Sequence, residues 1–213
     1  FINFTLSYFR ASGASPPKPV SSFGHFGFDD LLIKSIRRSE FAQPTPIQAQ
    51  AIPALLSGRD CIGIAKTGSG KTAAFLWPML VHIMDQPRLL KGQGPIGLIL
   101  VPTRELALQI YGEAKKFGKV YNLEVVCAYG GGSKWEQSKG FEAGAEIAIA
   151  TPGLSYYLIY RFFTSNNYHL KITSTVGFWC QTIHKKFLRR FDTIFGLKMM
   201  VKSGLEKNVL RFH

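Results

Sequence analysis

Cysteine and histidine are scarce in this chain. Its three cysteines, Cys61, Cys127 and Cys180, lie far apart among 213 residues and show no paired spacing. This pattern argues against a disulfide framework and against a zinc site, and it fits a reducing compartment. The five histidines show no metal-ligand spacing either, so we expect them to be ordinary surface or core residues.

Long apolar runs are lacking as well. No stretch approaches the roughly 18 uncharged residues that a membrane-spanning helix needs, so we expect a soluble protein without stable membrane insertion. Residues 1–9 are apolar, but they have no leading methionine and no basic stretch, which makes them a poor signal peptide. Nucleus and cytoplasm are both compatible with this composition.

Acidic residues are half as numerous as basic ones. The chain holds 13 Asp and Glu against 26 Lys and Arg, for a formal charge of +13. Residues 154–213 carry ten basic and two acidic side chains, and residues 1–153 carry sixteen and eleven. We expect a polyanionic partner, with nucleic acid the first candidate and an anionic membrane surface the second.

One motif constrains the chemistry more than any other. Residues 65–72 read Ala65-Lys66-Thr67-Gly68-Ser69-Gly70-Lys71-Thr72, the pattern of a phosphate-binding loop. Gly68 and Gly70 let the backbone N–H groups point at phosphates, and the helix that follows adds the positive end of its dipole. Ala65 replaces the glycine of the strict pattern and is also small enough for a tight turn. We expect the catalytic pair Lys71 and Thr72 to contact the β- and γ-phosphates and to bind Mg²⁺, respectively.

Short apolar segments alternate with helical segments after a ragged N-terminus and a Pro/Ser-rich linker at residues 1–22. Strands are predicted at 60–64, 95–101, 123–129 and 145–150, and helices at 29–38, 45–56, 72–84, 103–117 and 133–141. This alternation predicts an α/β fold with an open parallel sheet and helices on both faces. Ligands of such sheets bind beyond the carboxyl ends of the strands.

Four further blocks join the phosphate loop in a recognisable order. They are Gln43-Pro44-Thr45-Pro46-Ile47-Gln48, Pro102-Thr103-Arg104-Glu105-Leu106-Ala107, Tyr129-Gly130-Gly131-Gly132 and Thr151-Pro152-Gly153. Together these blocks resemble the first RecA-like domain of the DEAD-box RNA helicases over residues 23–153. The resemblance implies a P-loop NTPase of RecA-like fold that uses ATP and Mg²⁺, binds RNA through its phosphate backbone and unwinds it.

The resemblance also implies an adenine-binding site, formed by residues that precede the phosphate loop in the sequence. A glutamine amide offers a donor and an acceptor in one plane, which suits the N6 and N7 edge of adenine, so Gln48 would select ATP. Phe23 would stack on the adenine ring, and Gln43 belongs to the same block. This block argues against another phosphate-loop enzyme, such as a small-molecule kinase or a GTPase. The predicted nucleotide site thus comprises Phe23, Gln43, Gln48, Ala65, Lys66, Thr67, Gly68, Ser69, Gly70, Lys71 and Thr72.

A second predicted site would hold RNA phosphates. The turn at Pro102, Thr103 and Arg104 offers a hydroxyl, a cation and backbone N–H groups at a helix start. Spacing alone would equally make Thr103 a helix cap and Arg104 a solvated charge. The resemblance favours phosphate binding and implies that the track continues through Gly131, Thr151 and Gly153.

The chain departs from the family pattern after Gly153. Leu154 stands where the family has arginine, and no Asp-Glu-Ala-Asp block follows. Phosphoryl transfer needs carboxylates to hold Mg²⁺ and to position water. The Ser-Ala-Thr block and the second RecA-like domain are also absent, so we expect weak ATP binding without hydrolysis. The incomplete sheet should be marginal or aggregation-prone unless residues 154–213 supply its missing neighbours.

Residues 154–213 form a basic, aromatic-rich tail of unknown fold. One helical face would gather Ile183, Phe187, Leu188, Phe191, Ile194, Phe195 and Met199. A basic amphipathic helix of this kind suits an anionic membrane surface or a groove on a protein partner. The interpretation we favour is that the tail derives from an alternative exon, a retained intron or an incorrect gene model. The alternative function is then a non-catalytic, truncated RNA- or nucleotide-binding isoform that competes with the full enzyme.

Overall fold

The computed structural model describes residues 15–91, 93, 95–151, 174–179 and 199–202. Every strand and helix predicted between residues 23 and 153 is present. The helices are α1 (Asp30–Arg38), α2 (Pro46–Leu56), α3 (Lys71–Met84), α4 (Arg104–Gly118) and α5 (Lys134–Glu142), with short 3-10 turns η1 (Phe23–His25) and η2 (Lys119–Tyr121). The strands are β1 (Cys61–Ile64), β2 (Gly97–Leu100), β3 (Val125–Ala128), β4 (Ile147–Ala150), β5 (Ser174–Trp179) and β6 (Met199–Lys202).

The helix starts follow local sequence signals. The Asp29 carboxylate accepts the Leu32 N–H at the start of α1, and the Thr103 hydroxyl accepts the Leu106 N–H at the start of α4. Helix α2 begins at Pro46, whose fixed φ and missing N–H suit the first helical position. Such caps depend on neighbouring residues only, which is why the sequence predicts these boundaries closely.

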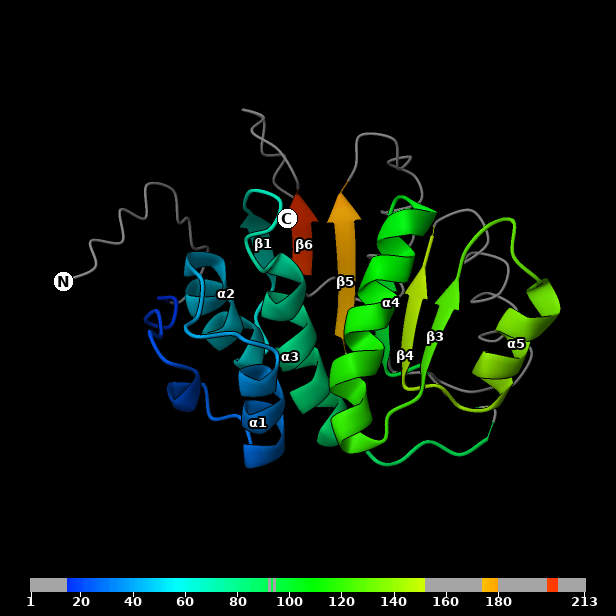
Figure 1. The fold of residues 1–213 in the computed structure, drawn as a ribbon, viewed down its shortest axis with the longest axis horizontal. Coiled ribbons are helices and arrows are strands. Elements are labelled where there is room, and N and C mark those ends of the chain that lie inside the picture. Colours follow the sequence, from blue (N-terminus) through cyan, green and yellow to red (C-terminus); the bar gives the residue numbers. More distant parts are fainter. Residues whose placement is uncertain (1–14, 92, 94, 152–173, 180–198, 203–213) are drawn as a thin grey trace.

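The six described strands form one parallel sheet in the order β1-β6-β5-β2-β4-β3. Strand β6 pairs with β1 from Cys61↔Met199 to Ile64↔Lys202, and β5 pairs with β2 from Gly97↔Ser174. The tail therefore supplies both strands between β1 and β2 (Figure 1).

Met199 begins strand β6, which corrects its predicted place in a helix. Hydrogen bonding to β1 on one side and β5 on the other outweighs the helical periodicity of its sequence. The rest of the predicted amphipathic helix, residues 183–198, lies outside the described residues.

Helices cover both faces of the sheet, as predicted. Neighbouring residues of a strand point to opposite faces, and on β3 they meet different helices. Val125 contacts Gly118 of α4, whereas Val126 packs so closely on Gly140 of α5 that a Cβ there would lie 2.8 Å from its Cγ2. Helices α3 and α4 cross one face, and α5 lies beyond β3 (Figure 1).

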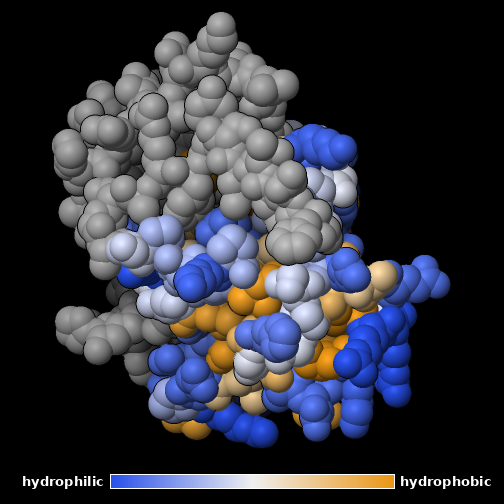
Figure 2. Space-filling model, turned by 90° about the vertical axis from the view of Figure 1, so that its left-hand side faces the viewer, coloured by the Kyte–Doolittle hydropathy of each residue, from blue (hydrophilic) through white to orange (hydrophobic). Residues whose placement is uncertain are grey.

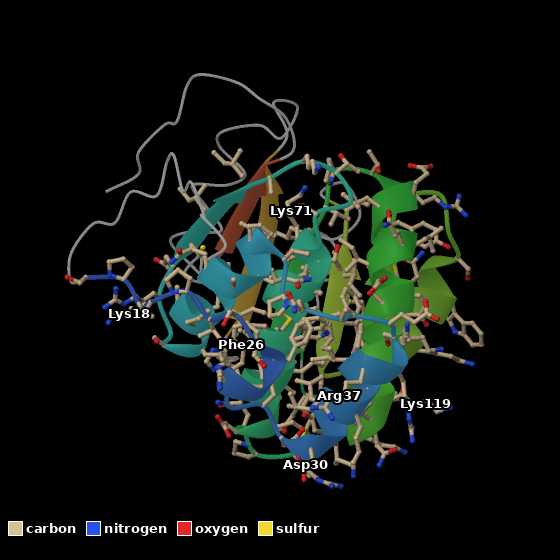
Figure 3. All side chains as sticks on the ribbon, turned by 60° about the vertical axis from the view of Figure 1, so that its left-hand side comes forward. Lys18, Phe26, Asp30, Arg37, Lys71 and Lys119 are labelled. Carbon is tan, nitrogen blue, oxygen red and sulfur yellow. The ribbon has the colours of Figure 1, made fainter. Side chains whose placement is uncertain are left out.

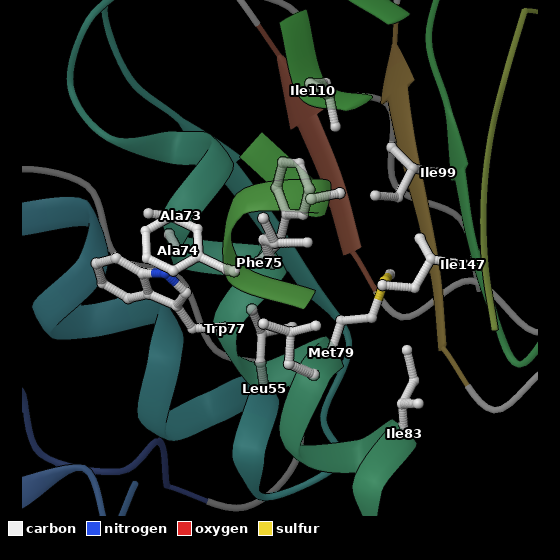
Figure 4. Close-up of a cluster of buried hydrophobic side chains, with 14 of the residues drawn as sticks. Leu55, Ala73, Ala74, Phe75, Trp77, Met79, Ile83, Ile99, Ile110 and Ile147 are labelled. Atoms are coloured by element: carbon white, nitrogen blue, oxygen red, sulfur yellow. The ribbon is translucent and has the colours of Figure 1, made fainter. Parts of the chain in front are cut away.

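Helix α3 is the centre of the core. Every residue from Ala73 to Leu80 is buried, because α3 packs between the sheet and α2. Met79 reaches toward Ile147 of β4, and Trp77 projects from another side of the helix (Figure 4). Four aromatic rings meet the Trp77 indole edge to face, with centroids 5.1 to 6.3 Å away, and they belong to Phe23, Phe28, Phe41 and Phe117.

The outer surface mixes apolar and charged side chains. Figure 2 shows the side of the molecule that lies at the left of Figure 1, where an apolar patch is bordered by hydrophilic residues. No helix in the described part of the chain is long and apolar enough to cross a membrane.

Candidate functional site

Four segments that carry predicted site residues lie at one edge of the sheet. Because all strands are parallel, the segments that follow β1, β2, β3 and β4 leave the sheet at the same edge. These segments hold the phosphate loop, the Pro102–Arg104 turn, the Tyr129–Gly132 loop and Thr151. Strands β6 and β5 lie between β1 and β2. At about 4.8 Å per strand spacing, the phosphate loop therefore lies roughly 14 Å from the Pro102–Arg104 turn and farther from the segments that follow β4 and β3.

The phosphate loop has the backbone that its glycines predict. Gly68 and Gly70 adopt left-handed φ values of 77° and 80°, and helix α3 starts directly after Gly70. Lys71 is the first residue of this helix, and its Nζ donates to the carbonyls of Ala65 at 2.6 Å and Lys66 at 2.5 Å. An ammonium has three donors, so one remains for a phosphate oxygen.

Partial burial lowers the pKa of Lys71. The shift reflects the loss of hydration of the ammonium, which disfavours its charged form. Bound phosphate would oppose this effect by supplying negative charge beside the same nitrogen.

The Gln48 side chain is fully buried and makes hydrogen bonds that support the phosphate loop. Its Nε2 donates to the Gly70 carbonyl at 3.1 Å, and its Oε1 accepts the Thr45 N–H at 3.0 Å. The Thr45 hydroxyl donates in turn to the Ser69 carbonyl at 2.8 Å. Both ends of the Gln48 amide are thus engaged in the protein, and each retains capacity for one further bond. That this amide also reads adenine stays a prediction.

Phe23 and Gln43 occupy contrasting environments. The Phe23 side chain is 7% exposed, and its ring lies edge-on to Trp77 at 5.6 Å. Gln43 is exposed ahead of helix α2. The structure therefore places the Phe23 ring in the core against Trp77, and its stacking on adenine stays a prediction.

The loop carries polar groups that fit a phosphate ligand and Mg²⁺. Within the described part of the chain, the buried Ser69 hydroxyl has no hydrogen-bond partner, and a Cβ at Gly68 would meet no atom within 4 Å. Thr72 is half-buried one residue after Lys71. No group of three or more His, Cys, Asp or Glu side chains in the described ranges could hold a metal ion. Mg²⁺ here would therefore rely on the Thr72 hydroxyl, phosphate oxygens and water, a set this ion commonly accepts.

Cys61 precedes this loop in strand β1. Burial, and secondly the Asp60 carboxylate, raise the pKa of its thiol to about 11. The thiol is therefore protonated near neutral pH, which makes it a poor nucleophile or metal ligand.

The second predicted site brings two distant segments into contact. The Arg104 guanidinium lies over the Tyr129 ring, 4.5 Å from its centroid. Thr103 caps helix α4, as its spacing suggested, whereas Arg104 is an exposed cation that an aromatic face orients. Pro102 precedes them and is half-buried.

The glycine loop and Thr151 complete the described part of this site. Gly131 is exposed, with a left-handed φ of 85°. Thr151 is 8% exposed, and its N–H donates to the Ala128 carbonyl at 2.9 Å, which ties the end of β4 to the end of β3. Gly153, the last residue of the predicted track, lies outside the described residues.

The sequence assigned no role to Tyr129, although it begins the glycine block, and it gave no indication of Gln137. Gln137 is buried in helix α5, where its Oε1 accepts the Tyr129 N–H and its Nε2 donates to the Tyr129 carbonyl, both at 3.2 Å. A Cβ at Gly132 would lie 2.4 Å from that Nε2. The run of glycines was the available signal, since a close approach by another group requires glycine.

The parallel sheet and the strand–loop–helix at residues 61–84 define a P-loop nucleotide-binding α/β protein. The sequence comparison narrows this class. The DEAD/DEAH box helicase family matches residues 45–177, which is more than half of the chain, and the chain belongs to this family. The matched range continues beyond Gly153 and includes part of β5.

Individual relatives share the same region. The chain is 65% identical over 144 residues to the ATP-dependent RNA helicase DDX42 of Homo sapiens, which covers 68% of this chain and 15% of that protein. It is 58% identical over 144 residues to the DEAD-box ATP-dependent RNA helicase 24 of Arabidopsis thaliana, covering 68% and 19%. The chain thus spans less than a fifth of the length of these relatives.

A solved structure shares the fold. The crystal structure of the RNA-helicase Prp28 from Chaetomium thermophilum bound to ADP matches with a TM-score of 0.72 and 37% sequence identity. The match covers 90% of this chain and 46% of that one.

Proposed function

We propose that this chain binds ATP and the phosphate backbone of RNA in the manner of an ATP-dependent RNA helicase, but does not itself hydrolyse ATP. The single observation that carries the proposal is the connected set Gln48, Gly70 and Lys71. The buried Gln48 amide donates to the Gly70 carbonyl, the last one before helix α3, and Lys71 holds its ammonium inside the loop.

Each group at the loop has a role with a nucleotide. The Lys71 ammonium would contact the terminal phosphates, and the N–H groups at the start of α3 would face the same charge. The Thr72 hydroxyl would be the protein ligand of Mg²⁺, which when bound neutralises charge between the phosphates. Gln48 would contact the adenine edge with its remaining donor and acceptor, which requires that ligand binding uncover its fully buried side chain.

The proposed RNA contacts lie at the same edge of the sheet, on the segments that follow β2 and β3. Arg104 supplies the cation, held in place by the Tyr129 ring. Exposed Gly131 allows a sugar-phosphate chain to approach the backbone closely. These groups contact phosphates and not base edges, so this part of the interaction should be independent of sequence.

The strands beside the phosphate loop support the absence of hydrolysis. Strands β6 and β5 follow β1 in the sheet and end in Lys202 and Trp179, and neither strand contains an Asp or Glu within the described residues. The chain has one pair of adjacent acids, Asp29 and Asp30. Asp29 accepts bonds from Leu32 and from the Tyr121 hydroxyl, and Asp30 lies at the opposite end of the molecule from Lys71 (Figure 3). Loss of general-base assistance alone costs about 10²- to 10⁴-fold in rate.

The nucleotide part is tested by titrating the chain with a fluorescent ATP analogue and Mg²⁺, alongside a phosphate-release assay. We expect weak, saturable binding, a loss of about tenfold or more in Lys71→Ala, and no loss in the exposed control Lys119→Ala. Phosphate release should equal the buffer blank with and without RNA. RNA-stimulated release would refute the absence of hydrolysis, and a preference for GTP would refute the assignment of ATP.

The RNA part is tested by the salt dependence of binding to a labelled single strand. Arg104→Ala should weaken binding of all sequences similarly and lower the salt slope by about 1, because one phosphate contact is lost. Arg37→Ala removes an exposed arginine near the far end of the molecule (Figure 3) and should leave the slope unchanged. Equal slopes for the two variants would exclude the proposed track.

A further inference from the structure

Trp135 is an exposed tryptophan that the proposed function does not use. Its side chain is 67% exposed on the first turn of α5, whereas Trp77 is fully buried in the core. Tryptophan is usually well buried because its indole carries a large apolar area. An indole left in solvent at a functional edge is therefore a candidate contact surface.

A lysine one turn later accompanies the ring. The Lys139 Nζ lies 3.5 Å from the centroid of the Trp135 ring, in the range of a cation–π interaction. The cation occupies one face of the indole, and the high exposure of the residue leaves the opposite face accessible. This pairing also restricts the rotamers of Trp135, which lowers the entropic cost of a further stacking contact.

Trp135 follows one segment of the predicted RNA site in the sequence. Helix α5 begins directly after the Tyr129–Gly132 loop. Two residues beyond Trp135, the Gln137 amide makes both of its bonds to the Tyr129 backbone. These bonds tie helix α5, which carries Trp135, to the backbone of Tyr129, whose ring contacts the Arg104 guanidinium.

The chemistry around Trp135 favours a nucleic-acid base over a protein surface. Ser138 and Lys139, three and four residues later, are its polar neighbours on the helix surface, and Arg104 adds a second cation at the same sheet edge. A cation beside an exposed aromatic face matches the alternation of phosphate and base along a single strand. A protein-docking patch would instead be expected to be a contiguous apolar area.

We propose that Trp135 stacks on an unpaired base of the RNA strand whose phosphates contact Arg104 and the Gly131 loop. The proposal rests on the proposed RNA binding and adds a base contact to it. Because every base presents a π-face, the stack should tolerate any sequence. It should also favour single strands over duplexes, where bases are already stacked on one another.

The test compares two labelled strands with the full chain by fluorescence anisotropy. One is a uridine oligonucleotide of about 12 residues, and the other is an abasic strand of equal length and charge. The variants are Trp135→Ala, Trp135→Phe, and Leu90→Ala as a matched control. Leu90 is 69% exposed in the segment between α3 and β2, which lies at the amino-terminal edge of the sheet. Thermal melting of each variant checks that the fold is retained.

We expect the wild-type chain and Leu90→Ala to bind the uridine strand about 5- to 20-fold more tightly than the abasic strand. Trp135→Ala should abolish this difference and leave abasic binding unchanged, and Trp135→Phe should keep most of it. Equal wild-type affinity for both strands would overturn the stack while leaving backbone binding intact. A Trp135→Ala variant that keeps the difference, as expected for a protein-docking residue, would also overturn it. Failure of the wild type to bind either strand would instead refute the RNA binding on which the proposal rests.

Discussion

The Gln48 side chain lies directly against Gly70 of the phosphate loop. Its Nε2 donates to the Gly70 carbonyl at 3.1 Å, and a Cβ on residue 70 would lie 2.4 Å from the same nitrogen. The glycine is therefore required for two reasons, a left-handed φ of 80° and the close approach of the amide. The loop and the block that precedes it form one packed unit.

Gly70→Ala should destabilise the chain more than Gly68→Ala. Both glycines have left-handed φ values, so alanine at either site costs about 1–2 kcal/mol. Only residue 70 faces Gln48, and displacing this buried amide should cost about 1–3 kcal/mol more. Chemical denaturation of the two variants measures the difference. Equal losses would show that Gln48 moves aside without cost.

Gln48→Glu should make the stability of the chain depend on pH. An ionised carboxylate cannot donate to the Gly70 carbonyl, whereas the protonated acid can. Burial raises the pKa of the introduced acid above its unfolded value of about 4.3. The stability of this variant is therefore highest below that value and is lost as pH rises through the folded pKa. Denaturation at about pH 5 and about pH 8 should show the loss, and the exposed control Gln43→Glu should not. A pH-independent stability in Gln48→Glu would mean that its carboxylate reaches water.

The local sequence predicts much of this fold because several decisive signals are local. Thr103 before an apolar helix, Pro46 at a first helical position and glycines at 68 and 70 each determine the backbone within a few residues. The residues of the phosphate loop could be identified for the same reason. The tail strands could not, because Met199–Lys202 become a strand through pairing with β1 and β5, which lie far away in the sequence.

Side-chain partners were harder to predict than backbone elements. Phe23 is buried because Trp77, distant in sequence, presents its indole edge-on to the ring. Gln137 interacts with Tyr129 only because α5 folds back on the other face of β3. Such contacts depend on how helices and strands pack together, and the periodicity of the sequence does not predict them.

Gln137→Ala should weaken RNA binding without affecting nucleotide binding. Its side chain makes two hydrogen bonds to the Tyr129 backbone, and their loss leaves buried groups unpaired at a cost of about 1–3 kcal/mol. The Tyr129 ring that orients Arg104 would then be less fixed. We expect RNA affinity to fall about 3- to 10-fold, with unchanged affinity for a fluorescent ATP analogue. The exposed control Gln109→Ala should change neither, and a parallel loss of ATP affinity would indicate general unfolding.

The affinity for ATP should begin to fall at a lower pH than it would if Lys71 had the pKa of an ordinary lysine. Burial lowers the pKa of Lys71 in the free protein. Phosphate contact favours the charged ammonium and raises its pKa in the complex. Affinity is therefore complete below the free-state pKa and declines as pH rises from that value toward the pKa of the complex.

Lys71→Arg separates this effect from general alkaline effects, since a guanidinium stays charged across the whole range. The larger guanidinium group also fits the Ala65 and Lys66 carbonyls less well. We therefore expect this variant to bind ATP more weakly at neutral pH, with an affinity that does not change as the pH rises. Titrations with the fluorescent ATP analogue between about pH 7 and about pH 10 measure both curves. Parallel declines in the two proteins would assign the pH dependence to another group, and a flat wild-type curve would mean that the Lys71 ammonium does not contact the phosphates.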